Sequence, residues 1–178
     1  MELWDVYDIN KNKTGKTVLR GGNTLAEGEY HMTVHIAIFS SDGKMLIQQR
    51  VDCKDNWPGM WDITVGGAVT AGEDSATAAE RELFEEIGLS HSFHGVRPQL
   101  TLNHRNAFCD CYVMVKDVDI DALTLQDCEV QAVRWATLDE IYGMMNDGSF
   151  LCYHESFIRL LFDMRASHSV HRVNYITK

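Results

Sequence analysis

Prolines, long apolar runs and paired cysteine motifs are all scarce in this chain. Only two prolines interrupt its 178 residues, and no internal repeat divides them. With 45% hydrophobic residues, these features predict a single domain over residues 1–178 that is large enough for its own core. No apolar run approaches the roughly 18 residues of a membrane span, and the acidic N-terminus does not resemble a secretory signal. We therefore expect a cytoplasmic protein with no membrane partner.

Cysteines at the spacing of a metal knuckle are also missing. The five cysteines are scattered, and only Cys109 and Cys111 are close, at a spacing that places both on one face of a strand. A zinc site usually shows CxxC pairs or histidines at ligand spacing. We therefore interpret the cysteines as reduced, mostly buried thiols.

Basic residues are too few for a surface that binds nucleic acid. The chain has 16 basic and 26 acidic residues, with a net charge of −10, whereas nucleic-acid binding needs a basic footprint. We therefore expect no nucleic-acid partner. If the substrate is a phosphate ester, a bound divalent cation would let this anionic protein hold it.

Sequence periodicity predicts an α/β layered fold. Expected strands cover residues 4–8, 16–20, 31–40, 44–50, 61–65, 96–103, 107–116 and 130–135, and expected helices cover 74–87, 138–145 and 150–166. The first two strands are predicted to form a β-hairpin within an N-terminal extension over residues 1–28. In the last helix, an apolar stripe of Phe157, Leu160, Leu161 and Met164 is expected to pack into the core.

The expected helix after residue 74 carries three carboxylates in one narrow sector. Glu82, Glu85 and Glu86 are related by i+3 and i+4 spacing, so their side chains point into a shared space. Asp74 suits the N-cap of this helix, and Gly88 suits the left-handed residue that ends it. Crowded carboxylates repel one another unless a cation lies among them, and oxygen ligands are those that Mg²⁺ and Mn²⁺ prefer.

The wider pattern around these acids is far more specific than an acidic helix face. Gly67, Glu73, Arg81, Glu82, Glu85, Glu86 and Gly88 occur in the order G-x5-E-x7-R-E-[apolar]-x-E-E-x-G-[apolar]. At about 7% per residue type, a chance match of these fixed positions is on the order of one in a million. The pattern resembles the box of Nudix hydrolases over residues 67–89, and the chain is identified as a member of that family.

This resemblance implies an α/β/α sandwich with a mixed β-sheet and a metal-dependent reaction. Glu82, Glu85 and Glu86 would bind Mg²⁺ or Mn²⁺ together with the Gly67 carbonyl, and water would attack a diphosphate linkage. Glu82 is our first choice for the base that removes the water's proton, and Glu85 is our second.

The resemblance also implies supporting roles for the remaining box residues. Arg81 would orient a glutamate, and Glu73 would brace the loop or contribute to a second metal. Outside the box, Glu129 is a candidate for an extra metal ligand, and a solvated acid is an equally good interpretation.

A second resemblance lies upstream of the box. The segment from Arg50 to Lys54, followed by Trp57-Pro-Gly-Met-Trp61, is similar to that of isopentenyl-diphosphate isomerases, which share the Nudix fold. It implies that Arg50 and Lys54 grip the substrate diphosphate. His35 also resembles one metal ligand of the isomerases.

Departures from the isomerase pattern favour hydrolysis. Alignment on Trp61 places Gly66 and Ala68 where the isomerase has its catalytic cysteine and a metal-binding histidine, and residues 103–111 lack the isomerase's downstream glutamate pair. We therefore interpret His35 as a strand histidine packed in the fold.

The predicted function is divalent-metal-dependent hydrolysis of a diphosphate linkage in a nucleoside diphosphate derivative or another small organic diphosphate. An isomerase and a catalytically inactive, nucleotide-sensing Nudix domain are the alternatives. A small diphosphate is the expected partner, and homodimer formation stays open. Four further residues have two interpretations each, substrate contact or ordinary packing and surface: Trp57, Trp61, His104 and Arg105. Three histidines are expected at the surface: His154, His168 and His171.

Overall fold

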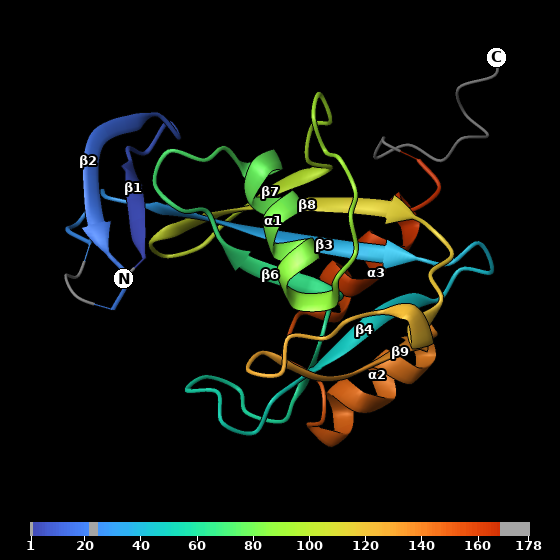
Figure 1. Cartoon of the computed structure of the whole chain (residues 1–178). Coiled ribbons are helices and arrows are strands. Elements are labelled where there is room, and N and C mark those ends of the chain that lie inside the picture. The colour runs from blue at the N-terminus through green and yellow to red at the C-terminus, as the bar shows by residue number, and fades with distance from the viewer. Residues whose placement is uncertain (1, 22–24, 168–178) are drawn as a thin grey trace, which may run out of the picture.

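A mixed seven-stranded sheet runs through the middle of the molecule (Figure 1). The computed structural model describes residues 2–21 and 25–167. The strands of this sheet are β3 (His31–Phe39), β4 (Met45–Arg50), β5 (Trp61–Asp62), β6 (Val65–Ala68), β7 (Leu100–Asn103), β8 (Ala107–Val115) and β9 (Val130–Ala136). Their order is β5-β4-β3-β8-β7, with β6 paired to β3 and β9 to β4. Strands β3 and β8 are parallel, and the other pairs are antiparallel.

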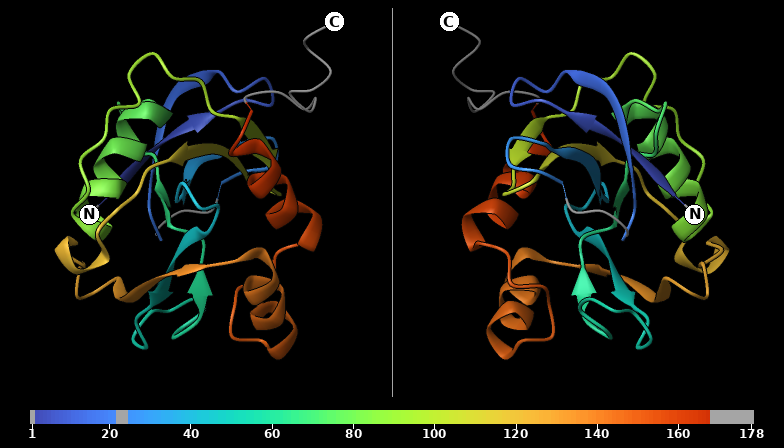
Figure 2. Two further views of the ribbon diagram at one scale, coloured as in Figure 1. Left: turned by 90° about the vertical axis from the view of Figure 1, so that its right-hand side faces the viewer. Right: turned by 90° about the vertical axis from the view of Figure 1, so that its left-hand side faces the viewer.

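Helices cover both faces of this sheet (Figure 2). Helix α1 (Ser75–Ile87) packs on one face, and α2 (Leu138–Asp147) and α3 (Glu155–Met164) pack on the other. Successive residues of a strand point to opposite faces, so even-numbered apolar residues of β3 pack in the cluster with α1, whereas Ala37 and Phe39 pack in the cluster with α2 and α3. A short 3-10 helix, Ile120–Ala122, lies between β8 and β9. The predicted α/β/α sandwich with a mixed sheet is confirmed.

Both ends of α1 have the predicted caps. The Asp74 side chain accepts a hydrogen bond from the backbone N–H of Thr77 at 2.8 Å, which satisfies a donor that the first turn leaves open. Gly88 ends the helix with a φ of 70°, a left-handed conformation that glycine adopts without strain. Leu83 and Ile87 are fully buried between the two ends, so capping and burial fix the same helix.

The N-terminal hairpin lies at one end of the main sheet (Figure 1). Strands β1 (Leu3–Tyr7) and β2 (Lys13–Leu19) pair antiparallel as a separate two-stranded sheet. A hairpin was predicted here, and its second strand begins three residues earlier than expected. Tyr7 and Tyr30 form a single antiparallel bridge that links the hairpin to the chain entering β3.

The hairpin also holds the loop that leads into α1. The Asp5 carboxylate accepts a hydrogen bond from the Gly72 N–H at 2.9 Å and pairs with Lys13 at 2.7 Å. The Lys13 ammonium donates a further hydrogen bond to the Glu73 carbonyl at 2.8 Å. This loop carries the first glutamate of the predicted box, so the hairpin braces the site from outside.

The expected strand at residues 61–65 is instead divided, and the division opens the sheet. The Thr64 hydroxyl accepts a hydrogen bond from the Ile38 N–H at 2.9 Å and donates one to the Leu46 carbonyl. A side chain therefore replaces backbone pairing between β3 and β4, whose registered pairing is confined to Phe39 with Met45. Strand β4 diverges from β6 as a result.

Two further expectations need correction. The last helix begins at Glu155 rather than at residue 150, because Phe150 is buried and bridges to Trp61 in extended conformation. The apolar stripe of that helix also excludes Leu160, which is 39% exposed, whereas Ile158 and Phe162 are buried. Among the described residues, no helix has the length and apolar character to cross a membrane.

Candidate functional site

A polar cleft of about 280 Å³ opens beside α1 where β4 and β6 diverge. It brings together eight residues that the sequence singles out: Arg50, Lys54, Gly67, Arg81, Glu82, Glu85, Glu86 and Glu129. These residues come from β4 and the loop after it, from β6, from α1 and from the loop before β9. Glu73 lies behind the lining and contacts the cleft through Arg81.

Glu86 is a buried carboxylate in the lining of the cleft. Its side chain accepts a hydrogen bond from the Gln48 amide at 3.0 Å. Burial and the neighbouring Glu82 raise the pKa of Glu86 to about 8. Burial likewise raises the pKa of Glu82, although Arg81 partly offsets that shift. The cleft therefore concentrates negative charge that the protein alone does not balance.

Gly67 is needed because the Glu82 carboxylate occupies the space of a side chain. A Cβ atom added at Gly67 would lie 2.0 Å from the carboxyl carbon of Glu82. Gly67 pairs with Val34 in the sheet, which fixes its backbone against the helix. The glycine thus lets a carboxylate and a strand backbone meet at one point, as the predicted metal site requires.

The Arg81 guanidinium joins three glutamates and the backbone. Its Nη1 donates to Glu82 at 2.8 Å and to Glu85 at 3.1 Å, while its Nε and Nη2 donate to the two Glu73 oxygens at 2.9 and 3.0 Å. A further bond from Nη2 reaches the Ala68 carbonyl at 2.9 Å. Arg81 therefore stands between the acids as the nearest positive charge, and it orients more carboxylates than the single one expected.

Glu73 is placed as a brace of the loop. Its carboxylate accepts a hydrogen bond from the Thr70 N–H at 3.1 Å in addition to the two bonds from Arg81. Although burial opposes the charged form, Arg81 and Thr70 hold the pKa of Glu73 below its usual value. These contacts match the first expected role of Glu73, which is to brace the loop, rather than the second, which is to bind a second metal.

Two cations from β4 and the loop after it also line the cleft. Arg50 donates two hydrogen bonds to the Asn56 carbonyl, at 3.0 and 3.2 Å, and its Nη1 lies 3.8 Å from an Asp62 oxygen. Lys54 forms an ion pair with Glu129. Burial, followed by the charge of Arg50, lowers the pKa of Lys54. Glu129 is thus the ion-pair partner of Lys54. This pairing was not expected from the sequence, which left Glu129 as either an extra metal ligand or a solvated acid.

The sequence and fold of this cleft can be compared with known proteins. The family model of the NUDIX domain matches residues 29–154, which include the whole cleft except its contribution from the hairpin. The chain belongs to the Nudix family. It is 37% identical to an uncharacterized Nudix hydrolase of Listeria monocytogenes, over 96% of this chain and 99% of that protein.

Two further Nudix-related proteins bear on the fold and on the alternative function. The crystal structure of DR0079 from Deinococcus radiodurans matches with a TM-score of 0.71 at 20% identity, over 90% of this chain and 97% of that one. At that identity the match shows a shared Nudix fold. The isopentenyl-diphosphate Delta-isomerase of Pectobacterium atrosepticum is 29% identical over 82% of this chain and 83% of that enzyme.

The residues of the cleft fit the divalent metal that Nudix hydrolases generally use. Glu82, Glu85 and Glu86 offer oxygen atoms alone, which is the donor set of a hard cation. The hydrogen bond to the buried Glu86 comes from a neutral amide, that of Gln48. Arg81 supplies one positive charge beside Glu82 and Glu85, and a bound cation would supply the rest of the charge that the three glutamates need.

Several residues of the Nudix cleft could not be found from the sequence. Glu2 and Arg20 form an ion pair at 2.7 Å in the hairpin and reach the cleft lining, which also includes Gln126. Gln48 contacts Glu86 from β4. None of them belongs to a local motif, because their places depend on how the hairpin and β4 pack against the box.

The aromatic and histidine candidates outside the box fall in different places. Trp57 is 49% exposed and has a φ of 54°, whereas Trp61 packs under Arg134, whose guanidinium lies 5.2 Å from the ring centre. His104 and Arg105 are exposed and do not line the cleft. His154 is exposed as expected, and His168 and His171 lie outside the described residues.

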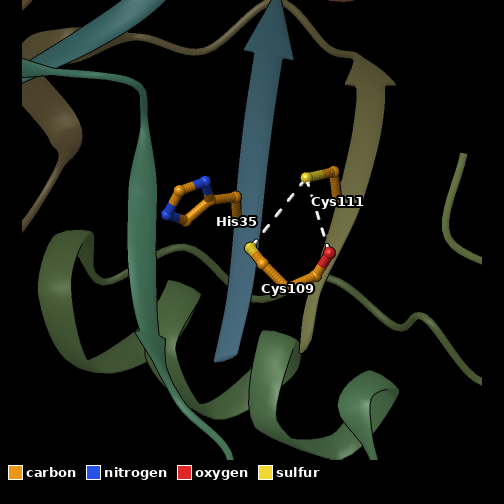
Figure 3. A group of neighbouring side chains, drawn as sticks. All are labelled: His35, Cys109 and Cys111. Atoms are coloured by element: carbon orange, nitrogen blue, oxygen red, sulfur yellow. Dashed lines mark hydrogen bonds between the residues drawn. The ribbon is translucent and has the colours of Figure 1, made fainter. Parts of the chain in front are cut away.

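The expectation of mostly buried cysteines holds for Cys109 and Cys111 alone. Three of the five thiols are exposed: Cys53, Cys128 and Cys152. The two buried thiols share one face of β8, as their spacing predicts, and that face also meets His35 of β3 (Figure 3). His35 lies in β3, as expected of a strand histidine, and a ring nitrogen of its side chain lies within 4.8 Å of both sulfur atoms.

Proposed function

We propose that this Nudix hydrolase cleaves the diphosphate linkage of a nucleoside diphosphate derivative or another small organic diphosphate, with Mg²⁺ or Mn²⁺ bound in the cleft. The observation that carries the proposal is the presence of both kinds of charge in one cleft. Glu82, Glu85 and Glu86 line it together with Arg50 and Lys54. A bound cation would be attracted to the three glutamates, and the negatively charged phosphates of the substrate would be attracted to the arginine and the lysine.

Each group of residues has a distinct task in this proposal. Arg50 and Lys54 hold the phosphate oxygens and orient the linkage. Glu82 accepts a proton from the attacking water, because burial gives this carboxylate a raised pKa and hence a stronger affinity for a proton. The bound cation supplies polarisation of the phosphoryl oxygens and acidification of the water. Glu85 is the second candidate for the base, and Arg81 keeps both carboxylates in place.

The isomerase alternative lacks support at β6. Gly66 and Ala68 flank Gly67 in this strand, so neither aligned position offers a thiol or an imidazole for proton transfer. Conversion of isopentenyl to dimethylallyl diphosphate without phosphate release would overturn the hydrolase proposal. Tight binding of a diphosphate without turnover would instead favour a sensor.

A screen of diphosphate compounds with Mg²⁺ or Mn²⁺, following release of phosphorylated products, tests the proposed function. We expect Glu85→Gln and Glu86→Gln each to lower turnover at least tenfold while the fold persists, since each removes a charged oxygen ligand. Glu155→Gln is the matched control, because Glu155 is exposed on α3 and away from the cleft. Full activity in either cleft variant would show that its carboxylate is not a metal ligand.

A further inference from the structure

We propose that His35, Cys109 and Cys111 form a second cation site, selective for a thiophilic metal such as Zn²⁺ and separate from the glutamate cleft. The proposal rests on a juxtaposition that the sequence hides. In the parallel pairing of β3 with β8, His35 is opposite Cys111, and Thr33 is opposite Cys109. Residues two apart in a strand share a face, so both thiols and the imidazole meet on the side of the sheet that α3 covers.

The spacing of the ligand atoms is suitable for zinc. The Sγ atoms of Cys109 and Cys111 are 4.0 Å apart. Two thiolates bound at about 2.3 Å to a tetrahedral zinc ion are about 3.8 Å apart, whereas a disulfide requires about 2.0 Å. One ring nitrogen of His35 lies within 4.8 Å of both sulfurs, and no other trio of His, Cys, Asp or Glu in the described chain is as compact (Figure 3).

The three side chains lie in a buried environment and contact one another. Both thiols are almost completely buried, at 0% and 1% exposure. The Nδ1 atom of His35 is buried and has no hydrogen-bond partner among the described residues. Buried polar atoms are normally satisfied, so a cation bound among the trio would provide what the protein does not.

Gly66 lies between the proposed second site and the glutamate cleft, and it contacts both. A Cβ atom at Gly66 would lie 2.9 Å from Cδ2 of His35, so the imidazole occupies the space left by the missing side chain. Gly66 itself lines the glutamate cleft. A metal ion held among the trio would meet sulfur and nitrogen ligands rather than carboxylates. Soft and borderline ions prefer such ligands, and Mg²⁺ does not.

Cobalt(II) is a direct probe of this site, because thiolate ligands give it a sulfur-to-metal charge-transfer band that carboxylates cannot produce. The full chain is reduced, stripped of metal and titrated with one equivalent of Co²⁺, followed by Zn²⁺. We expect the band to appear, to be displaced by Zn²⁺, and to be lost in Cys109→Ser and Cys111→Ser. His35→Gln should weaken Zn²⁺ binding at least tenfold.

Matched controls separate this site from the exposed thiols and from the cleft. A triple variant, with serine in place of Cys53, Cys128 and Cys152, should keep the band, and Glu85→Gln should keep it as well. Absence of the band in the reduced wild-type chain, or its persistence when Cys109 and Cys111 are both replaced, would overturn the proposal.

X-ray absorption at the zinc edge does not depend on the folding of the core variants. The triple serine variant, loaded with one equivalent of Zn²⁺, should show two sulfur atoms and at least one nitrogen around the metal. A shell of oxygen and nitrogen alone would overturn the proposal even if Cys109→Ser and Cys111→Ser fail to fold. Neither result depends on the hydrolase activity, so the two proposals stand or fall separately.

Discussion

At the residue scale, the buried carboxylate of Glu86 makes the stability of the metal-free fold depend on pH. Its pKa is about 8 in the folded chain against an ordinary value of 4.5, so the folded state holds the proton more tightly than the unfolded state does. The resulting stabilisation is fully present below pH 4.5 and is lost as the pH rises through about 8. Deprotonation leaves a buried charge that a cation would compensate.

We therefore expect Glu86→Gln to change the pH dependence of stability in metal-free protein. In a chelating buffer, the melting temperature of the wild type should fall between pH 4.5 and about 8, and that of Glu86→Gln should fall less. Near the upper limit the variant should be the more stable protein, although it is the less active one. Thermal unfolding at both limits measures this difference, and parallel curves for the two proteins would contradict it.

The sequence predicted the chemistry of individual residues better than their environments. The box pattern identified Gly67, Arg81 and the three glutamates, because one helix and the strand that precedes it in the sequence carry them all. It could not predict the contact of Gln48 with Glu86 or the pairing of Lys54 with Glu129, since each joins segments distant in sequence. The pKa shifts depend on those same distant neighbours.

At the scale of elements, the hairpin acts on the site through the loop that precedes α1. Asp5→Ala removes the acceptor of the Gly72 N–H and the partner of Lys13. We expect a loss of about 1 kcal/mol in the free energy of unfolding, because both bonds are partly exposed. Turnover should fall severalfold, because Glu73 and Arg81 lose a fixed loop.

Chemical denaturation and steady-state kinetics measure the two effects of Asp5→Ala. Lys16→Ala is the matched control, since its ion pair with Glu29 joins the same hairpin to a segment remote from the cleft. Equal turnover in Asp5→Ala and the wild type would show that the hairpin does not position the loop.

Elements with strong local signals were predicted well, and those that depend on packing were not. Helix α1 has an N-cap, a C-terminal glycine and a helical apolar pattern, so its bounds follow from residues within it. The division of the strand at residues 61–65 depends on hydrogen bonds from Thr64 to β3 and β4. The late start of α3 depends on Phe150 meeting Trp61. Neither contact can be recognised from the pattern of apolar and polar residues along the sequence.

At the scale of the whole molecule, two hydrophobic clusters on opposite faces of the sheet hold the layers together. Leu83 is fully buried in the cluster that fixes α1. We expect Leu83→Ala to lower the free energy of unfolding by about 2–5 kcal/mol, because it leaves a cavity in a packed interior. Leu160→Ala, at a site that is 39% exposed, should cost far less in a denaturant titration. Comparable losses would contradict the assigned layers.

The lining of the cleft contains charged side chains, one glutamine and small strand residues, with Ala68 as its only apolar side chain in the described part of the chain. A base, sugar or other organic group therefore finds no surface there on which to pack, and the chemistry at the acids is indifferent to it. Selectivity must then come from segments around the acids and the small strand residues, such as the hairpin, from which Glu2 and Arg20 reach the cleft. Under the proposed function, reaction and recognition are carried by different segments, and a change of substrate needs no change in α1.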